Sequence, residues 1–288
     1  MIAAAVVSWN TRDLLARCLE SLRDERVDLH VVDTGSTDGS PELVRSDFPG
    51  VTLHEPGNVG YGAAVNLVAE RTRSPWLLAA NADTAAEPGA LDALVEAGAV
   101  HRRAGAIAPR LVLPDGTAQH AAYPFPTLPF LALFNSGLAE RFFGDRLCLE
   151  GHWNPDRPRR VPWAIGAFLL IRRAAWDAAG GFDPAQWMYA EDLDLGWRLA
   201  RAGWHSRVEP RAVVRHESAA STSQAWGEDR VLAWQAATYD WLRRRRGPLR
   251  ARAAYLLNVT GATLRSQGEW AGRHRRAWRM EPPRPSLR

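Results

Sequence analysis

The 288-residue sequence contains no lysine, so all 36 of its basic side chains are arginines. A P-loop of the form G-x-x-x-x-G-K-[ST] is therefore excluded, because that loop needs a lysine at the phosphates. The first strand-like segment also lacks the G-x-G-x-x-G pattern of a dinucleotide-binding loop. Phosphate charge bound by this protein must be met by arginine, backbone amides or a metal ion instead.

Cysteine is almost absent as well, with Cys18 and Cys148 the only two. Two residues exclude a disulfide framework and give no zinc-site spacing. Cys18 falls on the apolar face of a predicted helix, so we expect it in the core. The longest apolar run, "AIGAFLLI", is too short to cross a bilayer. The chain opens directly with the strand-like "IAAAVVSWN", so we expect no signal peptide and a cytoplasmic protein.

What is present is typical of a soluble globular protein. Hydrophobic residues make up 46% of the sequence and charged residues 24%, and the net charge is +4. The length suits one large domain or two small ones, with a sizeable core.

The first half of the sequence alternates continuous apolar runs with helical patterns. Strands are expected at "AAAVVSWN", "DLHVVDTGS", "VTLHEP" and "PWLLAANAD". Helices are expected from about Thr11, at "SPELV" with Ser40 as N-cap and Pro41 in the first helical position, at "GYGAAVNLVAERT" and at "EPGALDALVEAGAV". This repeated strand–helix unit predicts an α/β fold with a mostly parallel open sheet and helices on both faces.

The second half is less regular. "AGAIAPRLVLPDGTAQHA" predicts a strand or hairpin with a Pro-Asp-Gly turn, and "VPWAIGAFLLIRRAAWDAAGGFD" predicts a strand and then a helix. "HSRVEPRAVVRHE" is interpreted as a final pair of strands. Residues 123–160 are rich in proline and aromatic residues without a clear period, so we expect an irregular excursion there.

Polar side chains follow four of the predicted strands, where each strand ends. In open α/β sheets, ligands bind outside the carboxyl ends of the strands. Acids at two separate ends suit a nucleotide, because one carboxylate can accept from a base or ribose and the other can hold a divalent metal on a diphosphate. The polar or glycine positions at these ends are Ser8, Asn10, Asp33, Ser36, Asn58, Gly60, Asn81 and Asp83.

Each of these segments also has a purely structural interpretation. "DTGSTDG" is compatible with a turn that its own side chains cap. "GNVGYG" is compatible with a flexible helix entry, and "NAD" with the start of a helix whose dipole favours the acid. Only their occurrence together favours a binding site.

Residues 187–204, "WMYAEDLDLGWRLARAGW", place three acids at the start of an amphipathic helix. The helix dipole favours acids at this position, so any of them can be structural. Asp194 and Arg198 are four residues apart and are expected to pair on the helix surface. Two large aromatic residues, Trp187 and Tyr189, stand just before the acids.

Taken in order, "VVSWN", "VVDTGSTDGS", "GNVGYGAAVN", "LLAANAD", "VPWAIGAFLLIRR", "GGFDPAQWMYAEDLDLGWRLARAGW" and "VVRHES" resemble the inverting glycosyltransferases of family two. Within that family they are most similar to bacterial rhamnosyltransferases that use dTDP-L-rhamnose. The resemblance implies a GT-A fold with a nucleotide-sugar-binding half at 1–110, an acceptor-binding half with the catalytic base at 111–220, and a basic helical extension at 221–288.

The same resemblance implies roles for single residues. Asp192 would be the catalytic base, and Asp83 would bind Mg²⁺ or Mn²⁺ with help from His216. Asp33 would contact the base or ribose, and Asn81 takes the first place of an Asp-x-Asp-like motif. The donor residues would be Ser8, Asn10, Asp33, Ser36, Asn58, Gly60, Asn81 and Asp83. The acceptor and sugar pocket would include Trp163, Gly166, Ala167, Tyr189 and Glu191.

The expected reaction is an inverting, metal-dependent transfer of a sugar, L-rhamnose as first choice, from a dTDP- or UDP-sugar to a hydroxyl of a glycolipid or polysaccharide precursor. A small natural product as acceptor is one alternative. A sugar nucleotidyltransferase is another, although it would need a glycine-rich N-terminal loop with a basic residue. A non-catalytic carbohydrate-binding module is the third. The oligomeric state is open, with a homodimer as one option.

The C-terminal segment combines many arginines with tryptophan, tyrosine and leucine. It is compatible with packing on the catalytic body, with contact to an anionic membrane surface, or with nucleic acid. We rank packing first and membrane contact at the inner face of the cell membrane second, and we expect no nucleic-acid partner.

Overall fold

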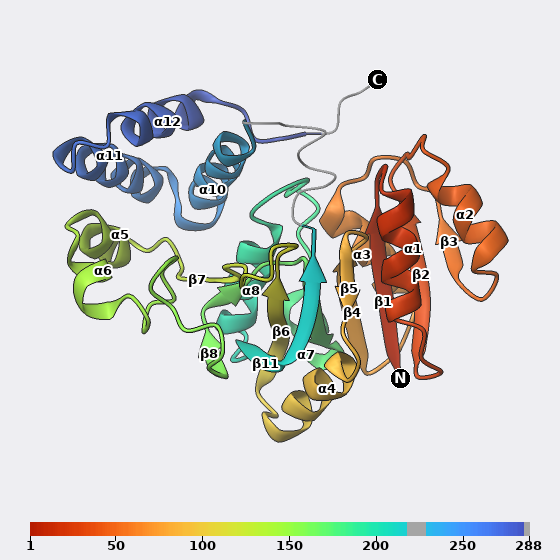
Figure 1. Ribbon diagram of the computed structural model, residues 1–288. Helices are drawn as coiled ribbons and strands as arrows, with labels where there is room; N and C mark the ends of the chain where they lie inside the picture. The colour runs from red at the N-terminus through yellow and green to blue at the C-terminus, as the bar shows by residue number, and fades with distance from the viewer. Residues whose placement is uncertain (218–228, 285–288) are drawn as a thin grey trace.

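The computed structural model describes residues 1–217 and 229–284. Ser218 of the "VVRHES" segment and the predicted start of the C-terminal extension at 221–228 lie outside these residues. The described chain forms one α/β body with a layer of C-terminal helices beside it (Figure 1). Among the described residues, no helix is both long enough and apolar enough to span a membrane.

One large sheet runs through both halves of the chain, in the order β3-β2-β1-β4-β10-β6-β11-β5. Its first four strands are parallel to one another, and β10 is antiparallel to its neighbours β4 and β6. Strands β6 and β11 are parallel, and β8 and β5 pair antiparallel with β11. The bounds are β1 Ile2–Ser8, β2 Val27–Asp33, β3 Thr52–His54, β4 Trp76–Asn81, β5 Thr84–Ala86, β6 Ala104–Val112, β8 Arg159–Val161, β10 Phe168–Arg172 and β11 His205–His216, with β7 Ala122–Tyr123 and β9 Trp163–Ala164 as a separate pair.

Helices cover both faces of this sheet, as predicted. The helices on one face are α1 Arg12–Ser21, α2 Ser40–Asp47 and α4 Ala90–Val100, and those on the other are α3 Tyr61–Arg71, α7 Arg173–Ala179 and α8 Glu191–Arg201. The sequence of β1 is apolar throughout because both faces of the strand are buried. Ala4 and Val6 belong to one core cluster, and Ala3 and Ala5 belong to the other. A strand buried on both faces cannot alternate with polar residues.

Three local predictions were wrong, and the first concerns the start of α2. Its N-cap is Gly39, in the left-handed conformation with φ 86°, and Ser40 is the first helical residue. Asp38 takes the capping role instead, because its Oδ1 accepts from the Ser40 amide at 3.0 Å and from the Ser40 hydroxyl at 2.6 Å.

The second concerns residues 123–160, which contain the helices α5 Leu128–Asn135 and α6 Leu138–Phe143. Helix α5 begins at Thr127, whose hydroxyl accepts from the Phe130 amide at 3.4 Å. Its sequence "LPFLALFN" shows no period because it is apolar on nearly every side. It packs closely on α11, where a Cβ on Gly261 would lie 2.3 Å from Asn135 Oδ1.

The third concerns residues 205–217, which form the single strand β11 rather than two strands. The register against β6 shifts between Glu209 and Val213, around Pro210. Proline cannot donate to a sheet ladder, so the strand bulges there and continues.

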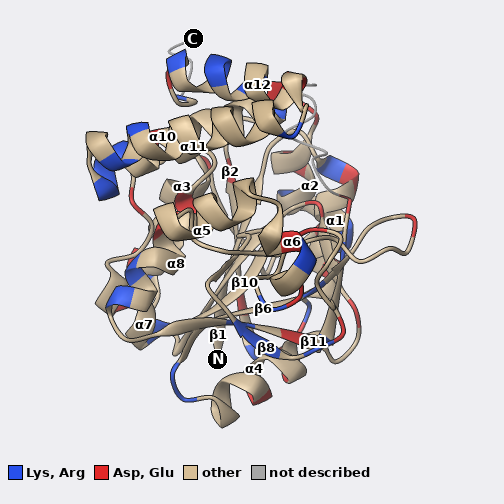
Figure 2. Cartoon of the chain, turned by 90° about the vertical axis from the view of Figure 1, so that its left-hand side faces the viewer, with Lys and Arg blue, Asp and Glu red and all other residues tan. Residues whose placement is uncertain are grey.

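The C-terminal helices α10 Arg230–Arg246, α11 Pro248–Leu264 and α12 Gly268–Arg279 form a layer over one end of the body (Figures 1 and 2). A third core cluster joins this layer to the body, with Trp241 and Leu242 of α10 in the same cluster as Leu193 of α8 and Leu131 of α5. Packing on the body, the interpretation ranked first, is therefore confirmed for these helices.

A buried carboxylate, Asp194, ties α8 to α10. One oxygen accepts from Trp241 Nε1 at 2.9 Å and Arg245 Nε at 2.6 Å, and the other from Arg198 Nε at 2.7 Å and Arg245 Nη2 at 3.0 Å. Burial alone would raise the pKa of Asp194, but the hydrogen bonds from Arg245 and the charge of Arg198 outweigh it and lower the pKa. The predicted pairing with Arg198 is confirmed.

The run of four arginines at the end of α10 is also used in packing. Arg243 lies over the Trp278 ring at 4.0 Å, and Arg246 lies over the Trp197 ring at 4.6 Å. Arg244 pairs with Asp240 at 2.8 Å, and Arg245 pairs with Asp183 as well as Asp194. The sequence "RRRR" therefore acts here as a set of contacts between helices.

We predict that Asp194→Asn lowers the free energy of unfolding by about 3–5 kcal/mol, because it leaves Arg198 and Arg245 without their buried countercharge. Urea unfolding followed by circular dichroism measures this. Asp177→Asn, at an exposed acid on the neighbouring helix α7, is the control and should change stability by less than about 0.5 kcal/mol. Equal losses in the two variants would contradict the anchoring role of Asp194.

Candidate active site

Asp192 lies in the first turn of α8, with both carboxylate oxygens held by backbone amides. Oδ2 accepts from the Gly166 amide at 3.1 Å, and Oδ1 accepts from the Leu193 amide at 2.8 Å. Residue 166 must be small, because a Cβ there would lie 3.2 Å from Tyr61 Cε1 and 3.7 Å from Asp192 Cβ. The loop before β10 and the start of α8 therefore fix this carboxylate from two sides.

The backbone just before α8 is strained. Tyr189 and Ala190 have φ values of 62° and 61°, in the left-handed region that non-glycine residues rarely adopt. Such residues cost of order 1–3 kcal/mol each and persist where the surroundings enforce them, often at functional sites. Here the strain turns the chain so that Glu191 and Asp192 begin the helix.

Burial shifts the pKa of both neighbouring acids, Glu191 and Asp192, in the same direction. Burial raises the pKa of Asp192 to about 6, although the amides of Leu193 and Gly166 lower it. Burial raises the pKa of Glu191 well above its usual value, and the charge of Asp192 raises it further. Burial thus disfavours the charged form of both acids, and a charge on Asp192 disfavours a second charge on Glu191 beside it.

Tyr61, at the start of α3, connects this acid pair to the strand ends, and the sequence analysis missed it. Its hydroxyl donates to the Gly166 carbonyl, next to the amide that holds Asp192. Burial and the charges of Glu191, Asp192 and Asp83 raise the pKa of Tyr61. The only signal in the sequence was the aromatic residue between the two glycines of "GYG". The prediction for this segment considered its glycines and not the tyrosine.

Asp83 and His216 come together at the other side of the site. His216 Nε2 lies 3.3 Å from Asp83 Oδ1, and both side chains are buried. His216 Nδ1 lies 2.6 Å from Gln119 Oε1, an oxygen that can only accept, so Nδ1 carries the proton.

This pair fits a divalent cation that is completed by other ligands. A carboxylate oxygen and an imidazole nitrogen facing each other suit Mn²⁺ and related ions. Within residues 1–217 and 229–284, no group of three or more His, Cys, Asp or Glu side chains is arranged to hold a metal. The protein thus supplies two donors here, and the rest would have to come from phosphate or water oxygens.

The loops that follow β1 and β2 are hydrogen-bonded to each other through residues that were predicted to bind the nucleotide-sugar donor. The Asn10 amide donates to Ser36 Oγ at 2.8 Å, and Asn10 Oδ1 accepts from the Thr37 amide at 2.8 Å. Asp33 Oδ1 accepts from the amides of Gly35 and Ser36 at 3.0 Å and 2.7 Å. The turn interpretation of "DTGSTDG" holds for this oxygen, whereas Asp33 Oδ2 is buried without a hydrogen-bond partner.

The remaining strand-end residues differ in accessibility. Ser8 is buried, and its hydroxyl lies 3.3 Å from Thr11 Oγ1, so it stabilises the turn between β1 and α1 from the inside of the protein. Asn58 is exposed. Asn81 ends β4 with its amide donating to the Ala167 carbonyl at 2.8 Å. Gly60 is required by packing, because a Cβ there would lie 2.4 Å from the Trp187 side chain.

Two residues assigned to the acceptor and sugar pocket, Trp163 and Ala167, are buried. Trp163 is 3% exposed, donates from Nε1 to the Pro124 carbonyl at 3.0 Å, and presses on Gly196, where a Cβ would lie 2.5 Å away. Ala167 is buried in the main core. The structure places them behind the site, where Trp163 supports α8, while Gly166, Tyr189 and Glu191 lie around Asp192.

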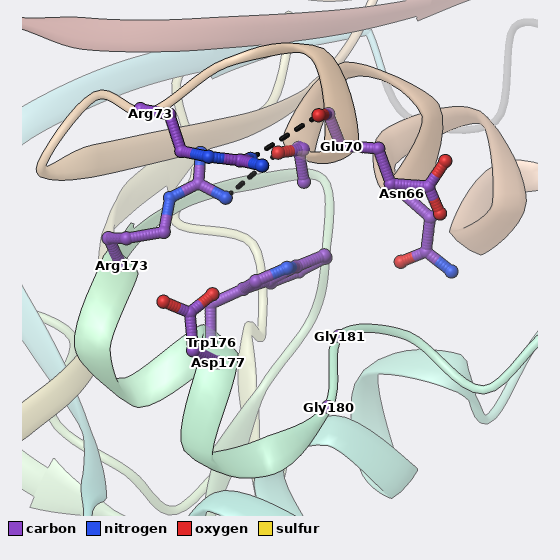
Figure 3. Close-up of a pocket in the computed structure, with 9 residues that line it drawn as sticks. Asn66, Glu70, Arg73, Arg173, Trp176, Asp177, Gly180 and Gly181 are labelled. Carbon is purple, nitrogen blue, oxygen red and sulfur yellow. Dashed lines mark hydrogen bonds between the residues drawn. The ribbon is translucent and has the colours of Figure 1, made fainter.

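Two cavities are visible, and the smaller lies away from this site. It has a volume of about 410 Å³ and lies between α3 and α7 (Figure 3). Its arginines are occupied, because Arg173 donates to the Ala69 carbonyl at 3.0 Å and Arg73 to the Glu70 carbonyl at 3.3 Å. The Arg173 amide bonds Pro75, just before β4 begins, so this cavity is at the edge opposite Asp83.

Comparison with known proteins gives consistent matches. Residues 4–142 match the family described as "Glycosyl transferase family 2", and residues 136–247 match "Glycosyl transferase family group 2". The N-acetylglucosaminyl-diphospho-decaprenol L-rhamnosyltransferase of Mycobacterium tuberculosis is 33% identical over 253 residues, which cover 78% of each chain.

Two solved structures show the same fold. A Pyrobaculum calidifontis mannosyltransferase in complex with GDP-Man and Mn²⁺ superposes with a TM-score of 0.58 at 16% identity, covering 96% of this chain and 84% of the other. GalNAc-T7 with UDP, GalNAc and Mn²⁺ gives a TM-score of 0.61 at 13% identity, covering 96% and 55%. The expected GT-A-like α/β fold is confirmed, and by its sequence matches this chain is a glycosyltransferase that belongs to glycosyl transferase family 2.

Proposed function

We propose that this enzyme transfers a sugar from a nucleoside-diphosphate donor to an acceptor hydroxyl with inversion, using Asp192 as its single base. The observation that carries the proposal is the position of Asp192: it lies in the first turn of α8, where two backbone amides hold its carboxylate and burial raises its pKa to about 6. A general base works best when its pKa is near the working pH.

The positions of Asp192 and its neighbours suggest what each residue does in the reaction. Asp192 takes the proton from the acceptor hydroxyl as that oxygen attacks the anomeric carbon from the side opposite the leaving diphosphate. Tyr61 and Gly166 keep Asp192 in place. A single displacement with one carboxylate inverts the sugar, and a positioned base contributes about 10²–10⁴-fold in rate.

The leaving group needs positive charge on the other side. Asp83 and His216 would hold a divalent cation, Mg²⁺ or Mn²⁺, which when bound neutralises the charge that develops on the departing diphosphate. Asp33 and the crosslinked loops of Asn10 and Ser36 would bind the nucleoside end at the neighbouring strand ends.

The substrates are proposed from the matched relative. Its name specifies an L-rhamnosyl transfer onto an N-acetylglucosaminyl-diphospho-lipid. We take L-rhamnose from a dTDP-sugar as the donor group and a lipid-linked glycan as the acceptor, so the enzyme would work at the inner face of the cell membrane. Release of a nucleoside diphosphate from dTDP-L-rhamnose, dependent on acceptor, is the direct test.

We predict that Asp192→Asn reduces transfer by at least about 10²-fold while leaving donor binding unchanged. Glu191→Gln is the matched control one residue away. Because a protonated glutamate and a glutamine are similar in shape and charge, that variant should keep most of the activity. Turnover with saturating acceptor and titration calorimetry with dTDP measure the two effects. Near-normal turnover in Asp192→Asn would show that another group is the base.

We predict that kcat/KM rises with pH through about 6 and then levels, as Asp192 ionises. The titratable groups near it are Glu191 and Tyr61, and also Tyr123, whose pKa is raised by burial and by the charges of Glu150 and Asp192. A rate that is flat between pH 5 and 8 in the wild-type enzyme would contradict the assignment.

The free energy of unfolding should fall over the pH range in which kcat/KM rises. The folded state favours protonated Asp192, so the protein loses stability as pH rises from about 3.8 to about 6, by at most about 3 kcal/mol. Asp192→Asn should therefore be more stable than the wild type above pH 6 and equal to it below pH 4.

We predict that Asp83→Ala abolishes the dependence of donor binding on Mn²⁺. Wild-type protein should bind dTDP at least about tenfold more tightly with Mn²⁺ than with chelator, whereas the variant should bind equally weakly in both. His216→Ala should reduce the Mn²⁺ dependence of dTDP binding by less than Asp83→Ala does, because the Asp83 carboxylate would still be there to hold the cation. Equal affinity of the wild type with and without chelator would argue against the cation at this pair.

A further inference from the structure

The larger cavity, of about 510 Å³, lies between the acceptor half and the C-terminal helices. Its walls come from β7, α5, β9, α8 and all three helices of the C-terminal layer, and most of its lining is aromatic or aliphatic. Its volume falls within the usual range of about 300–1,000 Å³ for small-molecule sites. The mechanism described above does not use it.

Part of the cavity lining lies near the proposed catalytic base, although Asp192 itself is not among the lining residues. Leu193, which follows Asp192 on α8, is part of the lining, and so is Trp163, three residues before Gly166. Tyr123, also in the lining, is near enough that the charge of Asp192 helps to raise its pKa, after burial and Glu150. A molecule in the cavity would therefore have one end close to the reacting hydroxyl.

The outer end reaches the surface. Trp234 and Trp270 line the cavity and yet are 36% and 42% exposed. Glu140 of α6 and Arg265 at the end of α11 also line it and pair at 3.6 Å. In the sequence, Phe142 and Leu264 are close to these two residues and are 61% and 80% exposed. The cavity opens to the surface beside the partly exposed rings of Trp234 and Trp270.

One group of polar side chains in its wall is paired internally. Asn135 Nδ2 donates to Asn258 Oδ1 at 3.0 Å, Asn258 Nδ2 donates to the Tyr239 hydroxyl at 3.1 Å, and that hydroxyl lies 3.0 Å from His274 Nδ1. Burial lowers the pKa of His274 to about 4. The lining also contains His120 and Gln235, which have buried polar atoms without a hydrogen-bond partner. Because aromatic and aliphatic side chains still make up most of the wall, the cavity suits an apolar chain, which needs no hydrogen-bond partner.

We propose that this cavity binds the apolar chain of the acceptor lipid and so brings its head group to Asp192. The proposal deepens the proposed function and rests on it, because it assigns the chain-binding part of the same acceptor site. Each buried CH₂ is worth about 0.8 kcal/mol, roughly fourfold in affinity, so binding should depend steeply on chain length.

The test uses two threonines with the same local structure. Thr238 lines the cavity and its hydroxyl donates to the Trp234 carbonyl at 2.9 Å, and Thr263, which is exposed and outside the lining, donates to the Val259 carbonyl at 2.8 Å. Thr238→Trp should fill the cavity, and Thr263→Trp is the matched control. Trp270→Ala, at the half-exposed mouth, is a second variant that removes wall rather than adding volume.

Binding is measured by titration calorimetry with two neutral probes, farnesol and prenol, which differ in chain length and carry no phosphate for the nucleotide site. Wild-type protein and Thr263→Trp should bind farnesol at least about tenfold more tightly than prenol. Thr238→Trp should lose this difference, and Trp270→Ala should weaken farnesol binding several-fold. No preference for farnesol in the wild type, or an unchanged preference in both variants, would overturn the proposal.

Kinetics then distinguish an acceptor site from a site for a resident lipid. With N-acetylglucosaminyl-diphospho-farnesol as acceptor, Thr238→Trp should raise KM at least about tenfold with kcat unchanged, and farnesol should compete with this acceptor. Binding of farnesol without competition would overturn the proposal. If Asp192→Asn kept its activity while this KM effect appeared, the proposed base would be wrong and the chain site would stand.

Discussion

The buried carboxylate of Asp194 is the contact on which the geometry of the site depends. Four N–H groups from Arg198, Trp241 and Arg245 surround it, and two of these residues belong to α10. Asp192 lies two residues earlier on the same helix, with one oxygen on the Gly166 amide. Because α8 is fixed between the sheet and α10, the base is fixed relative to the strand ends. The C-terminal layer thus supports catalysis without touching the proposed donor site.

Glu191, Asp192 and Asp194 are three acids within four residues, and a different environment shifts the pKa of each. Asp194 is surrounded by guanidinium groups and is held ionised. Glu191 is buried with an oxygen that has no hydrogen-bond partner, and its pKa is raised well above the usual range. Asp192 has two amide donors but no cation, so its pKa settles near 6. The environment of each carboxylate, rather than its residue type, therefore separates the ion-paired anchor Asp194 from the two buried acids that precede it, of which Asp192 is the proposed base.

Much of the fold was predictable because its signals are local. The apolar runs of β1, β2 and β4 and the polar residues at their ends follow from burial on both faces of a parallel sheet. The ordered set of motifs correctly indicated the family. Helix α5 was missed because a helix that is apolar on nearly every side has no period. The segment "HSRVEPRAVVRHE" was interpreted as two strands, whereas a bulge around Pro210 lets the single strand β11 continue past it.

The sequence by itself determined the layered α/β architecture, the family and the candidate acids, since these depend on residue order and on spacing within single elements. Only the tertiary structure decided that Asp194 is surrounded by arginines, that Tyr61 bonds the loop whose amide holds Asp192, that the arginine run of α10 is used in packing, and that an apolar cavity lies between α8 and the C-terminal helices. Each of these depends on partners far apart in the chain, such as Asp194 and Arg245 or Tyr61 and Gly166, whose proximity no local pattern encodes.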